Sequence, residues 1–196
     1  MQVCAVAGGV GSARFCSGLL SFLGSDELTI VVNTGDDERI RGLHVSPDID
    51  TVLYHLAAST DWDRGWGISG ETFVAHERYR EIAGRAGVDD ADLQAWFALG
   101  DRDLATHQLR TRLLDTGKTL TEATQALTRA FGIGAKVLPA TNDRLRTIME
   151  LASGERVDFQ DYFVKRGQSD EVTSVSYAGA AEASPAPGTL EAIEGA

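Results

Sequence analysis

The first 32 residues contain a strand, a glycine turn, a helix and a second strand, and this order constrains the fold more than any other feature. Val3–Ala7 is a continuous apolar run, typical of a strand covered on both faces. The glycine turn Gly8-Gly9-Val10-Gly11 interrupts it, a helical segment follows, and Leu28–Val32 is apolar again. Two strands joined by such a crossover are parallel, and the crossover is almost always right-handed. The sequence therefore predicts a βαβ unit and an α/β fold.

The rest of the chain extends this unit into one domain spanning residues 1–196. We expect a three-layer, Rossmann-like domain with a mainly parallel sheet, a β-hairpin over residues 145–165 and a further strand over residues 171–177. Thr119 and Glu122 have the spacing of a capping box, which predicts a helix start. Residues 189–193 begin a helix that no strand follows, so we expect the C-terminal part of the fold to be missing. The first helix is predicted to turn five apolar residues inward, namely Phe15, Leu19, Leu20, Phe22 and Leu23.

Charge and composition exclude several classes of protein. The chain carries 18 basic and 29 acidic residues, a net charge of −11, which argues against a nucleic-acid-binding surface. No apolar run approaches the ~18 residues of a membrane helix, and the N-terminus lacks the basic region of a signal peptide. The two cysteines, Cys4 and Cys16, are typical of buried thiols in a reducing cytoplasm. The excess of acid over a few lysines favours either a high-salt cytoplasm or GC-rich coding.

Four aspartates follow the second predicted strand. Asp36 and Asp37 come directly after it, and Asp48 and Asp50 stand at the start of the next predicted helix. Carboxylates at these places point into the crevice where open α/β sheets bind ligands. Mg²⁺ binds there through one or two carboxylates and substrate phosphates. The competing interpretation makes Asp48 a helix cap and Asp36-Asp37 a solvated turn.

The glycine turn is a candidate phosphate-binding loop. Gly8, Gly9, Gly11 and Ser12 lie between a strand and a helix N-terminus, where backbone N–H groups approach phosphates. The turn is neither a P-loop nor a dinucleotide fingerprint, because its glycine spacing differs from both. Arg14 is placed to supply the positive charge that the P-loop lysine brings. The competing interpretation is a tight turn that needs a positive φ.

Two further segments carry candidate binding residues. In Gly100-Asp101-Arg102-Asp103, Arg102 is placed to clamp a phosphate in bidentate fashion. His107, on the helix that follows, is more often a structural residue than a catalyst at such a place. Trp66, in a glycine-rich loop, is placed to stack on a flat heterocycle or simply to hold the loop down.

Taken together, these motifs closely resemble the 2-phospho-L-lactate transferase (CofD/FbiA) family along the whole chain. The resemblance rests on the Gly-Gly-Val-Gly start, the Asn33-Thr34-Gly35-Asp36-Asp37 loop, the segment that begins Ser46-Pro47-Asp48-Ile49-Asp50, and the segment that begins Gly100-Asp101-Arg102. Members are about half as long again and continue into a Gly-Pro-Ser-Asn-Pro loop that this chain lacks.

The resemblance implies a transferase of coenzyme F-420 biosynthesis. Such an enzyme moves a 2-phospholactyl or phosphoenolpyruvyl group from a guanosine diphosphate-linked donor to the deazaflavin Fo, and GMP leaves with the help of Mg²⁺. Asp48 and Asp50 are then the expected catalytic residues, with Asp37, Asp48 and Asp36 at the metal. Asp50, Ala98, Arg102 and Trp66 are the expected Fo contacts, although some relatives carry a basic residue where Ala98 stands. A cytoplasmic homodimer is expected, with neither nucleic acid nor membrane as a partner.

Two other functions remain open at this stage. Related nucleotide-sugar-binding regulators share the glycine start, but they read Pro-Gly-Asp-Ile-Arg where this chain has Pro47-Asp48-Ile49-Asp50. The second carboxylate favours the transferase. An inactive fragment is the third class, because the later part of the family's length is absent.

Overall fold

The predicted βαβ unit forms the centre of the fold. The computed structural model describes residues 1–88 and 94–196. Strands β1 (Val3–Ala7), β2 (Leu28–Val32) and β5 (Lys136–Pro139) form a parallel sheet in the order β1-β2-β5. Val3 pairs with Leu28 and Ala7 with Val32, and helix α1 (Gly9–Leu20) connects the two strands. The α/β fold and the parallel pairing are therefore confirmed.

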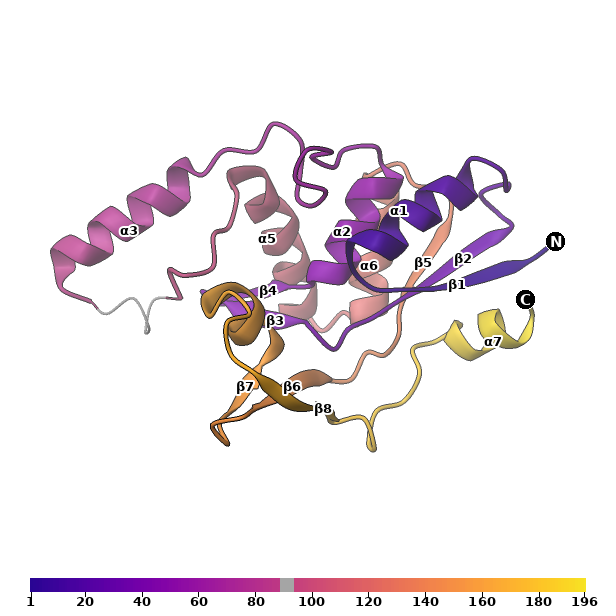
Figure 1. Cartoon of the computed structure of the whole chain (residues 1–196). Helices are drawn as coiled ribbons and strands as arrows, with labels where there is room; N and C mark the ends of the chain where they lie inside the picture. Colours follow the sequence, from indigo (N-terminus) through magenta and orange to yellow (C-terminus); the bar gives the residue numbers. More distant parts are fainter. Residues whose placement is uncertain (89–93) are drawn as a thin grey trace.

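Helices cover one face of this sheet. Figure 1 shows α1, α2 (Pro47–Leu56) and α6 (Leu120–Ala130) gathered on that side, with α5 (Asp101–Asp115) beyond them. Thr119 and Glu122 form both bonds of the predicted capping box at the start of α6. The core between sheet and helices consists of small and branched apolar side chains, including Ala5, Ile30, Val32, Val137, Ala13, Cys16, Val52, Leu53 and Leu127.

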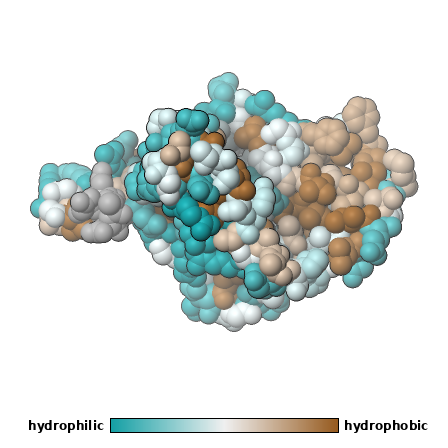
Figure 2. Space-filling model, turned by 60° about the horizontal axis from the view of Figure 1, so that its bottom comes forward, coloured by the Kyte–Doolittle hydropathy of each residue, from teal (hydrophilic) through white to brown (hydrophobic). Residues whose placement is uncertain are grey.

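The opposite face of the sheet is covered less completely. The short helix α7 (Thr189–Glu194) lies against β1, and the Thr189 hydroxyl donates to the carbonyl of Pro139 at 3.3 Å. Val6 is nevertheless 76% exposed. Figure 2 shows hydrophobic residues gathered on the side of the molecule where β1 and α7 lie. The expectation that β1 is covered on both faces is therefore wrong for the part of the chain that the structure describes.

Helix α1 buries a narrower stripe than predicted. Ala13 and Cys16 are buried, and Leu19, Leu20 and Leu23 pack against the same core. Phe15 is 64% and Phe22 88% exposed, so the expectation that both turn inward is wrong. A helix turns by about 100° per residue, which carries position 15 away from the inner face that holds positions 13 and 16, while Phe22 lies in the turn after α1. Apolar type alone therefore misassigned the two rings.

Antiparallel strands complete the fold. β3 (Glu38–Ile40) and β4 (Leu43–Val45) form a short hairpin that the sequence did not predict. A second antiparallel sheet has the order β7-β6-β8, with β6 at Arg146–Leu151, β7 at Arg156–Asp158 and β8 at Val172–Ala178. The predicted hairpin is thus correct at its turn, but its second strand ends at Asp158. A helical turn, η1 (Asp161–Lys165), replaces the remainder.

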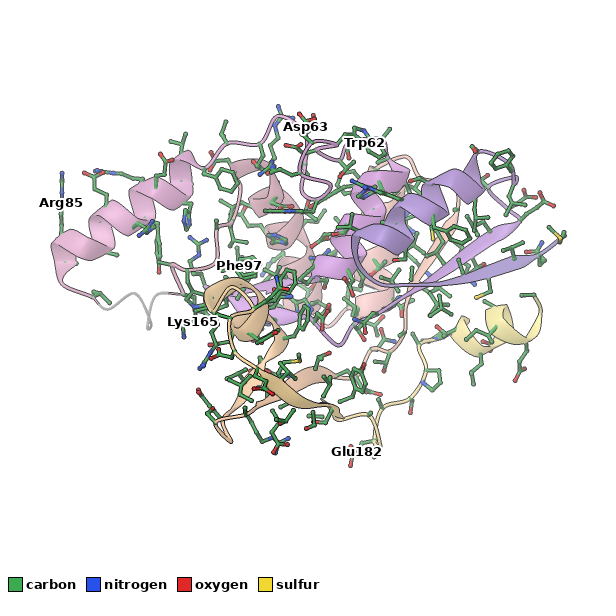
Figure 3. The ribbon with its side chains drawn as sticks, viewed as in Figure 1. Trp62, Asp63, Arg85, Phe97, Lys165 and Glu182 are labelled. Atoms are coloured by element: carbon green, nitrogen blue, oxygen red, sulfur yellow. The ribbon has the colours of Figure 1, made fainter. Side chains whose placement is uncertain are left out.

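Helix α3 (Val74–Ala86) projects from the body of the molecule. Figures 1 and 3 show it extending to one side, with Arg85 near its far end. It stops at Gly87, whose φ of 69° lies in the left-handed region that glycine adopts without strain. Among the described helices, none is both long and apolar enough to cross a bilayer.

Candidate functional site

The glycine turn and the acidic loop meet at the carboxyl ends of β1 and β2. The amide of Asn33, directly after β2, donates to the carbonyl of Ala7 at the end of β1, with a separation of 2.8 Å. Helix α1 begins directly after Gly8, and α2 begins at Pro47. Ligands of open α/β sheets bind outside this edge of the strands. The two sequence motifs therefore meet at the same edge of the sheet.

Asp48 lies where these segments converge. The side-chain amide of Asn33 donates to its Oδ2 at 2.8 Å, and the backbone N–H of Gly9 donates to the same carboxylate. Burial raises the pKa of Asp48, the two hydrogen bonds lower it, and the charge of Asp37 raises it again. Asp48 thus occupies the N-terminal end of α1 as well as the first turn of its own helix, two places that favour negative charge.

The glycines of the turn make room for that carboxylate. A Cβ on Gly8 would lie 3.1 Å from Asp48 Oδ2, and Gly9 has a φ of 70°. The Gly8 amide donates to the Ser12 hydroxyl at 2.8 Å, and that hydroxyl lies 2.7 Å from the Gly8 carbonyl, to which it donates. Of the amides in the predicted phosphate loop, those of Gly8 and Gly9 are therefore already engaged. Val10 and Gly11 follow in the first turn of α1, where amides have no partner within the helix.

Asp36 and Asp37 lie beside this arrangement in different environments. Asp37 Oδ2 accepts a hydrogen bond from the Ser46 hydroxyl at 2.7 Å and lies 3.1 Å from His44 Nε2. Its Oδ1 is buried and has no hydrogen-bond partner within the described chain. Burial raises the pKa of Asp36 to about 6, a hydrogen bond from Thr147 lowers it, and the charges of Asp48 and Asp37 raise it further.

These carboxylates fit a cation in charge, but they are not arranged as a finished site. The charges of Asp48 and Asp37 raise the pKa of Asp36, and the charge of Asp37 raises the pKa of Asp48, so a bound cation would relieve repulsion among them. Asp37 Oδ1 is an orphaned oxygen of the kind a hard cation prefers. Within residues 1–88 and 94–196, no three His, Cys, Asp or Glu side chains are grouped closely enough to hold a metal on their own. The metal ligands stay a prediction.

Asp50 is buried in a bidentate ion pair. It is 4% exposed, and Arg110 of α5, fully buried, donates from Nη1 to Asp50 Oδ2 at 3.0 Å and from Nη2 to Oδ1. Arg110 Nη1 also donates to the His44 carbonyl at 3.3 Å. Burial is the largest single effect and lowers the pKa of Arg110, but the charge of Asp50, its hydrogen bonds and the charges of Asp37 and Tyr54 together leave that pKa raised. In the structure, Asp50, which the family resemblance assigns to Fo and to catalysis, is therefore buried and ion-paired.

More titratable groups extend this network between α2 and α5. His107 Nδ1 lies 3.5 Å from Asp50 Oδ2, and the Tyr54 hydroxyl donates to Asp103 Oδ1. Burial raises the pKa of Asp103 to about 7, with the charge of Asp50 acting in the same direction. Burial lowers the pKa of His107 to about 4, so its ring is neutral at pH 7.

Sequence reasoning missed Arg110 altogether. Asp103, Thr106, His107 and Arg110 recur at helical spacing, so they share one face of α5, and Asp50 and Tyr54 are likewise one turn apart on α2. A polar stripe is usually the solvated side of a helix, which is why the pattern carried no signal of burial. The available signal was one acid, Asp50, and one base, Arg110, each on the polar stripe of its own helix.

The Gly100–Asp103 segment ties two helices together rather than opening toward a ligand. Glu71 accepts hydrogen bonds from the amides of Arg102 at 2.7 Å and Asp103 at 3.0 Å, at the start of α5. Asp101 accepts in turn from the amides of Val74 and Ala75, at the start of α3. The Arg102 guanidinium donates to the Ser69 carbonyl at 3.0 Å.

The remaining predicted contacts lie on the surface. Trp66 is 52% exposed, and the Arg64 guanidinium lies 5.2 Å from its ring centre. Arg14 is exposed and lies against Gly65 of the same loop, while Ala98 is exposed as well. Figure 3 shows Trp62 and Asp63 in this loop, and the Trp62 ring meets His55 of α2 edge-on at 5.4 Å. The loop thus reaches α1 and α2, but no contact of Trp66, Ala98 or Arg102 with the aspartates is found among the described residues.

Comparison with known proteins finds one family along nearly the whole chain. The model of the family "2-phospho-L-lactate transferase CofD" matches residues 3–196. A phosphoenolpyruvate transferase of Kitasatospora aureofaciens is 41% identical over 98% of this chain, and a 2-phospho-L-lactate transferase of Methanosarcina mazei is 41% identical over 96%. The chain spans 59% of the length of each of these relatives.

A solved structure supports the fold. The crystal structure of a upf0052 family protein from Bacillus halodurans superposes with a TM-score of 0.59 over 98% of this chain and 56% of that one. Its sequence identity is 16%, so the likeness concerns the arrangement of strands and helices alone.

Proposed function

The chain belongs to the 2-phospho-L-lactate transferase CofD family, and we propose that it transfers a three-carbon phosphoacid group in the synthesis of coenzyme F-420. The observation that carries the proposal is the identity of about 40% with two kinds of transferase over nearly the whole chain. The names of these relatives, phosphoenolpyruvate transferase and 2-phospho-L-lactate transferase, differ only in the three-carbon acid. Because the chain spans 59% of the length of these relatives, their activity is a proposal for this chain.

In the proposed reaction, a hydroxyl of Fo attacks the phosphorus that carries the three-carbon acid. A new bond forms between that oxygen and the phosphorus, and the bond from this phosphorus to the bridging oxygen of GMP breaks. GMP leaves with the bridging oxygen, and the hydroxyl proton passes to a base. Phosphoryl transfer of this kind depends on holding the two oxygens in line and on neutralising the charge of the phosphates.

The residues at the carboxyl ends of β1 and β2 offer the groups that this reaction needs. Asp37 and Asp48, with Asp36 beside them, would hold Mg²⁺, which neutralises phosphate charge when it is bound. The N-terminal end of α1 supports the donor's phosphates through the amides of Val10 and Gly11, since those of Gly8 and Gly9 are engaged. Asp48 would therefore contribute to both the metal site and the phosphate site.

Asp50 has a constrained place in this scheme. The family resemblance assigns it to the Fo hydroxyl and to the transferred proton. Its oxygens accept from Arg110 in the structure, and Asp50 is only 4% exposed, so contact with a substrate requires the residues that cover it to move. Asp50 is proposed as the Fo contact, with Arg110 as its ion-pair partner in the free protein.

The acceptor side of the site is more open. Trp66 is half exposed in a glycine-rich loop that also contacts α1, so its ring is available to stack on the deazaflavin. Ala98 is exposed and offers no polar group to Fo. Arg102 reaches the site only if it leaves the Ser69 carbonyl. A cytoplasmic homodimer belongs to the same proposal.

Product analysis tests this function directly. The purified 196-residue chain is incubated with Fo, Mg²⁺ and either the phospholactyl or the phosphoenolpyruvyl guanosine diphosphate donor, and the products are identified by mass spectrometry. We expect GMP and a phosphoacid ester of Fo from one donor, formed more slowly than by a full-length relative, and almost none from the Asp48→Asn variant. Asp115→Asn is the matched control, because Asp115 is an exposed aspartate on α5. No product from either donor, under conditions where a full-length relative forms it, would contradict the proposal for this chain.

A further inference from the structure

The carboxylate of Asp37 is held through only one of its two oxygens. Its Oδ2 accepts a hydrogen bond from the Ser46 hydroxyl at 2.7 Å and lies 3.1 Å from His44 Nε2. An ionised carboxylate only accepts hydrogen bonds, so a neutral His44 contributes the N–H of its Nε2. The Oδ1 atom is buried, and no group of residues 1–88 or 94–196 forms a hydrogen bond with it. Both donors therefore act on one oxygen of Asp37 and leave the other without a partner.

The Ser46 side chain does not take the role that its position favours. It is the N-cap residue of α2, where a serine hydroxyl usually accepts a hydrogen bond from a backbone N–H of the first turn. In the described part of the chain, the fully buried Ser46 forms no such bond with its helix. Its hydroxyl donates to Asp37 instead. The side chain therefore supports the carboxylate of the loop after β2 rather than the start of α2.

His44 is fixed at its backbone as well as at its ring. It lies on β4, and its N–H donates to the Thr111 hydroxyl at 2.7 Å, while its carbonyl accepts from Arg110 Nη1 at 3.3 Å. Both partners belong to α5. The side chain of His44 is 23% exposed and is therefore largely enclosed. Because both backbone groups are anchored, the packing of β4 against α5 sets the position of the imidazole beside Asp37.

We propose that His44 and Ser46 are positioning residues of the cation site, which hold Asp37 by Oδ2 and so present Oδ1 alone to the ion. The inference rests on the cation site of the proposed function and adds a preference among cations to it. The terminal torsion of an aspartate is broad and roughly twofold, so two donors on the same oxygen select one orientation. Mg²⁺ demands near-ideal octahedral geometry, whereas Ca²⁺ also accepts carboxylates through both oxygens. An aspartate that offers one oxygen therefore favours the smaller ion.

Variants of the two donors test this role without any substrate. His44→Leu removes the ring donor, whereas His44→Gln retains an amide N–H that can replace it. Mn²⁺ binding is followed by electron paramagnetic resonance, and Ca²⁺ binding by its displacement of Mn²⁺. We expect His44→Leu and Ser46→Ala to lower the Mn²⁺ affinity about 10–100-fold, the usual effect of removing a partner that orients a metal ligand, and His44→Gln to recover most of it. His76→Leu, at a buried histidine on α3, should bind as the parent does.

Two readouts separate positioning from a purely structural role. With Oδ2 released, Asp37 can bind through both oxygens, so the affinity for Ca²⁺ relative to Mn²⁺ should rise in His44→Leu and in Ser46→Ala. In the Asp37→Asn background, neither change should cause a further loss, because both donors act through that carboxylate. Circular dichroism checks folding. Ser46→Ala removes a single hydroxyl and carries both readouts if His44→Leu does not fold.

The outcomes that overturn the inference differ from those that overturn the cation site. Equal Mn²⁺ affinity in the parent, His44→Leu and Ser46→Ala would leave the cation site in place and refute the positioning role. An unchanged ratio of Ca²⁺ to Mn²⁺ affinity, or a further loss in the Asp37→Asn background, would refute it as well. A parent chain that binds no Mn²⁺ would remove the cation site and this inference with it. Product formation is measured separately, so the transferase activity does not enter these results.

Discussion

Replacing Arg110 with methionine removes the guanidinium that forms an ion pair with the buried carboxylate of Asp50. Arg110 is fully buried and Asp50 is 4% exposed, so neither group gains much from solvent. Breaking a buried ion pair by removing one partner typically costs about 3–5 kcal/mol, because the remaining charge is left uncompensated. Against a usual domain stability of about 5–15 kcal/mol, the loss is a large fraction of the whole.

A double variant distinguishes a lost charge partner from lost packing. Combining Arg110→Met with Asp50→Leu removes both charges and should recover much of the loss.

Urea unfolding followed by circular dichroism measures these free energies. Arg112→Met is the control, because Arg112 is exposed on the same helix, and its effect should stay within about 0.5 kcal/mol. If Arg110→Met lay within about 1 kcal/mol of the parent at pH 7, or if the double variant were no more stable than the single one, the role given to this ion pair would be wrong.

Three further predictions follow from local geometry. The folded-state pKa of Asp103, near 7, exceeds its unfolded value, so its contribution to stability is lost as pH rises through 7. His107, with a pKa near 4, acts in the opposite direction. The difference in unfolding free energy between the parent and Asp103→Asn isolates the contribution of the aspartate. That difference should shift by more than about 1 kcal/mol in favour of Asp103→Asn between pH 5 and 8. Gly8→Ala should lower the free energy of unfolding by about 1–3 kcal/mol, because its Cβ would meet Asp48. Gly11→Ala, with open space around it, should stabilise α1 by about 0.5–1 kcal/mol. Equal melting temperatures for the two variants would count against this reasoning. Thr119→Ala should destabilise the chain by about 1 kcal/mol through loss of the α6 cap, and an unchanged urea midpoint would contradict it.

Much of the parallel core was predictable because its signals are local. The β1 and β2 runs are apolar and short, a glycine turn separates β1 from α1, and this combination allows few structures. The α6 cap was predictable for the same reason, since Thr119 and Glu122 act within one turn. The convergence of the glycine turn and the acidic loop followed from the rule for parallel strand ends.

The remainder depended on contacts between distant residues. Arg110 meets Asp50 across 60 positions of sequence, and Glu71 meets the start of α5 across 31. Nothing local to either segment indicates such a partner. The exposed rings of Phe15, on α1, and Phe22, in the turn after it, show the converse, because apolar type predicts burial only where a neighbouring element covers the side chain. The turn η1 after β7 likewise interrupts an alternating pattern that locally favours a strand.

Cation binding tests the central claim most directly, because the proposed site rests on the carboxylates at the strand ends. Mn²⁺, as a spectroscopic substitute for Mg²⁺, is titrated into the parent chain, and the free ion is followed by electron paramagnetic resonance. We expect one bound ion per chain and a loss of affinity of tenfold or more, about 1.4 kcal/mol, in both Asp37→Asn and Asp48→Asn. Asp115→Asn, an exposed aspartate ion-paired with Arg39, should bind as the parent does. The same dissociation constant for the parent and for Asp37→Asn and Asp48→Asn would contradict the account.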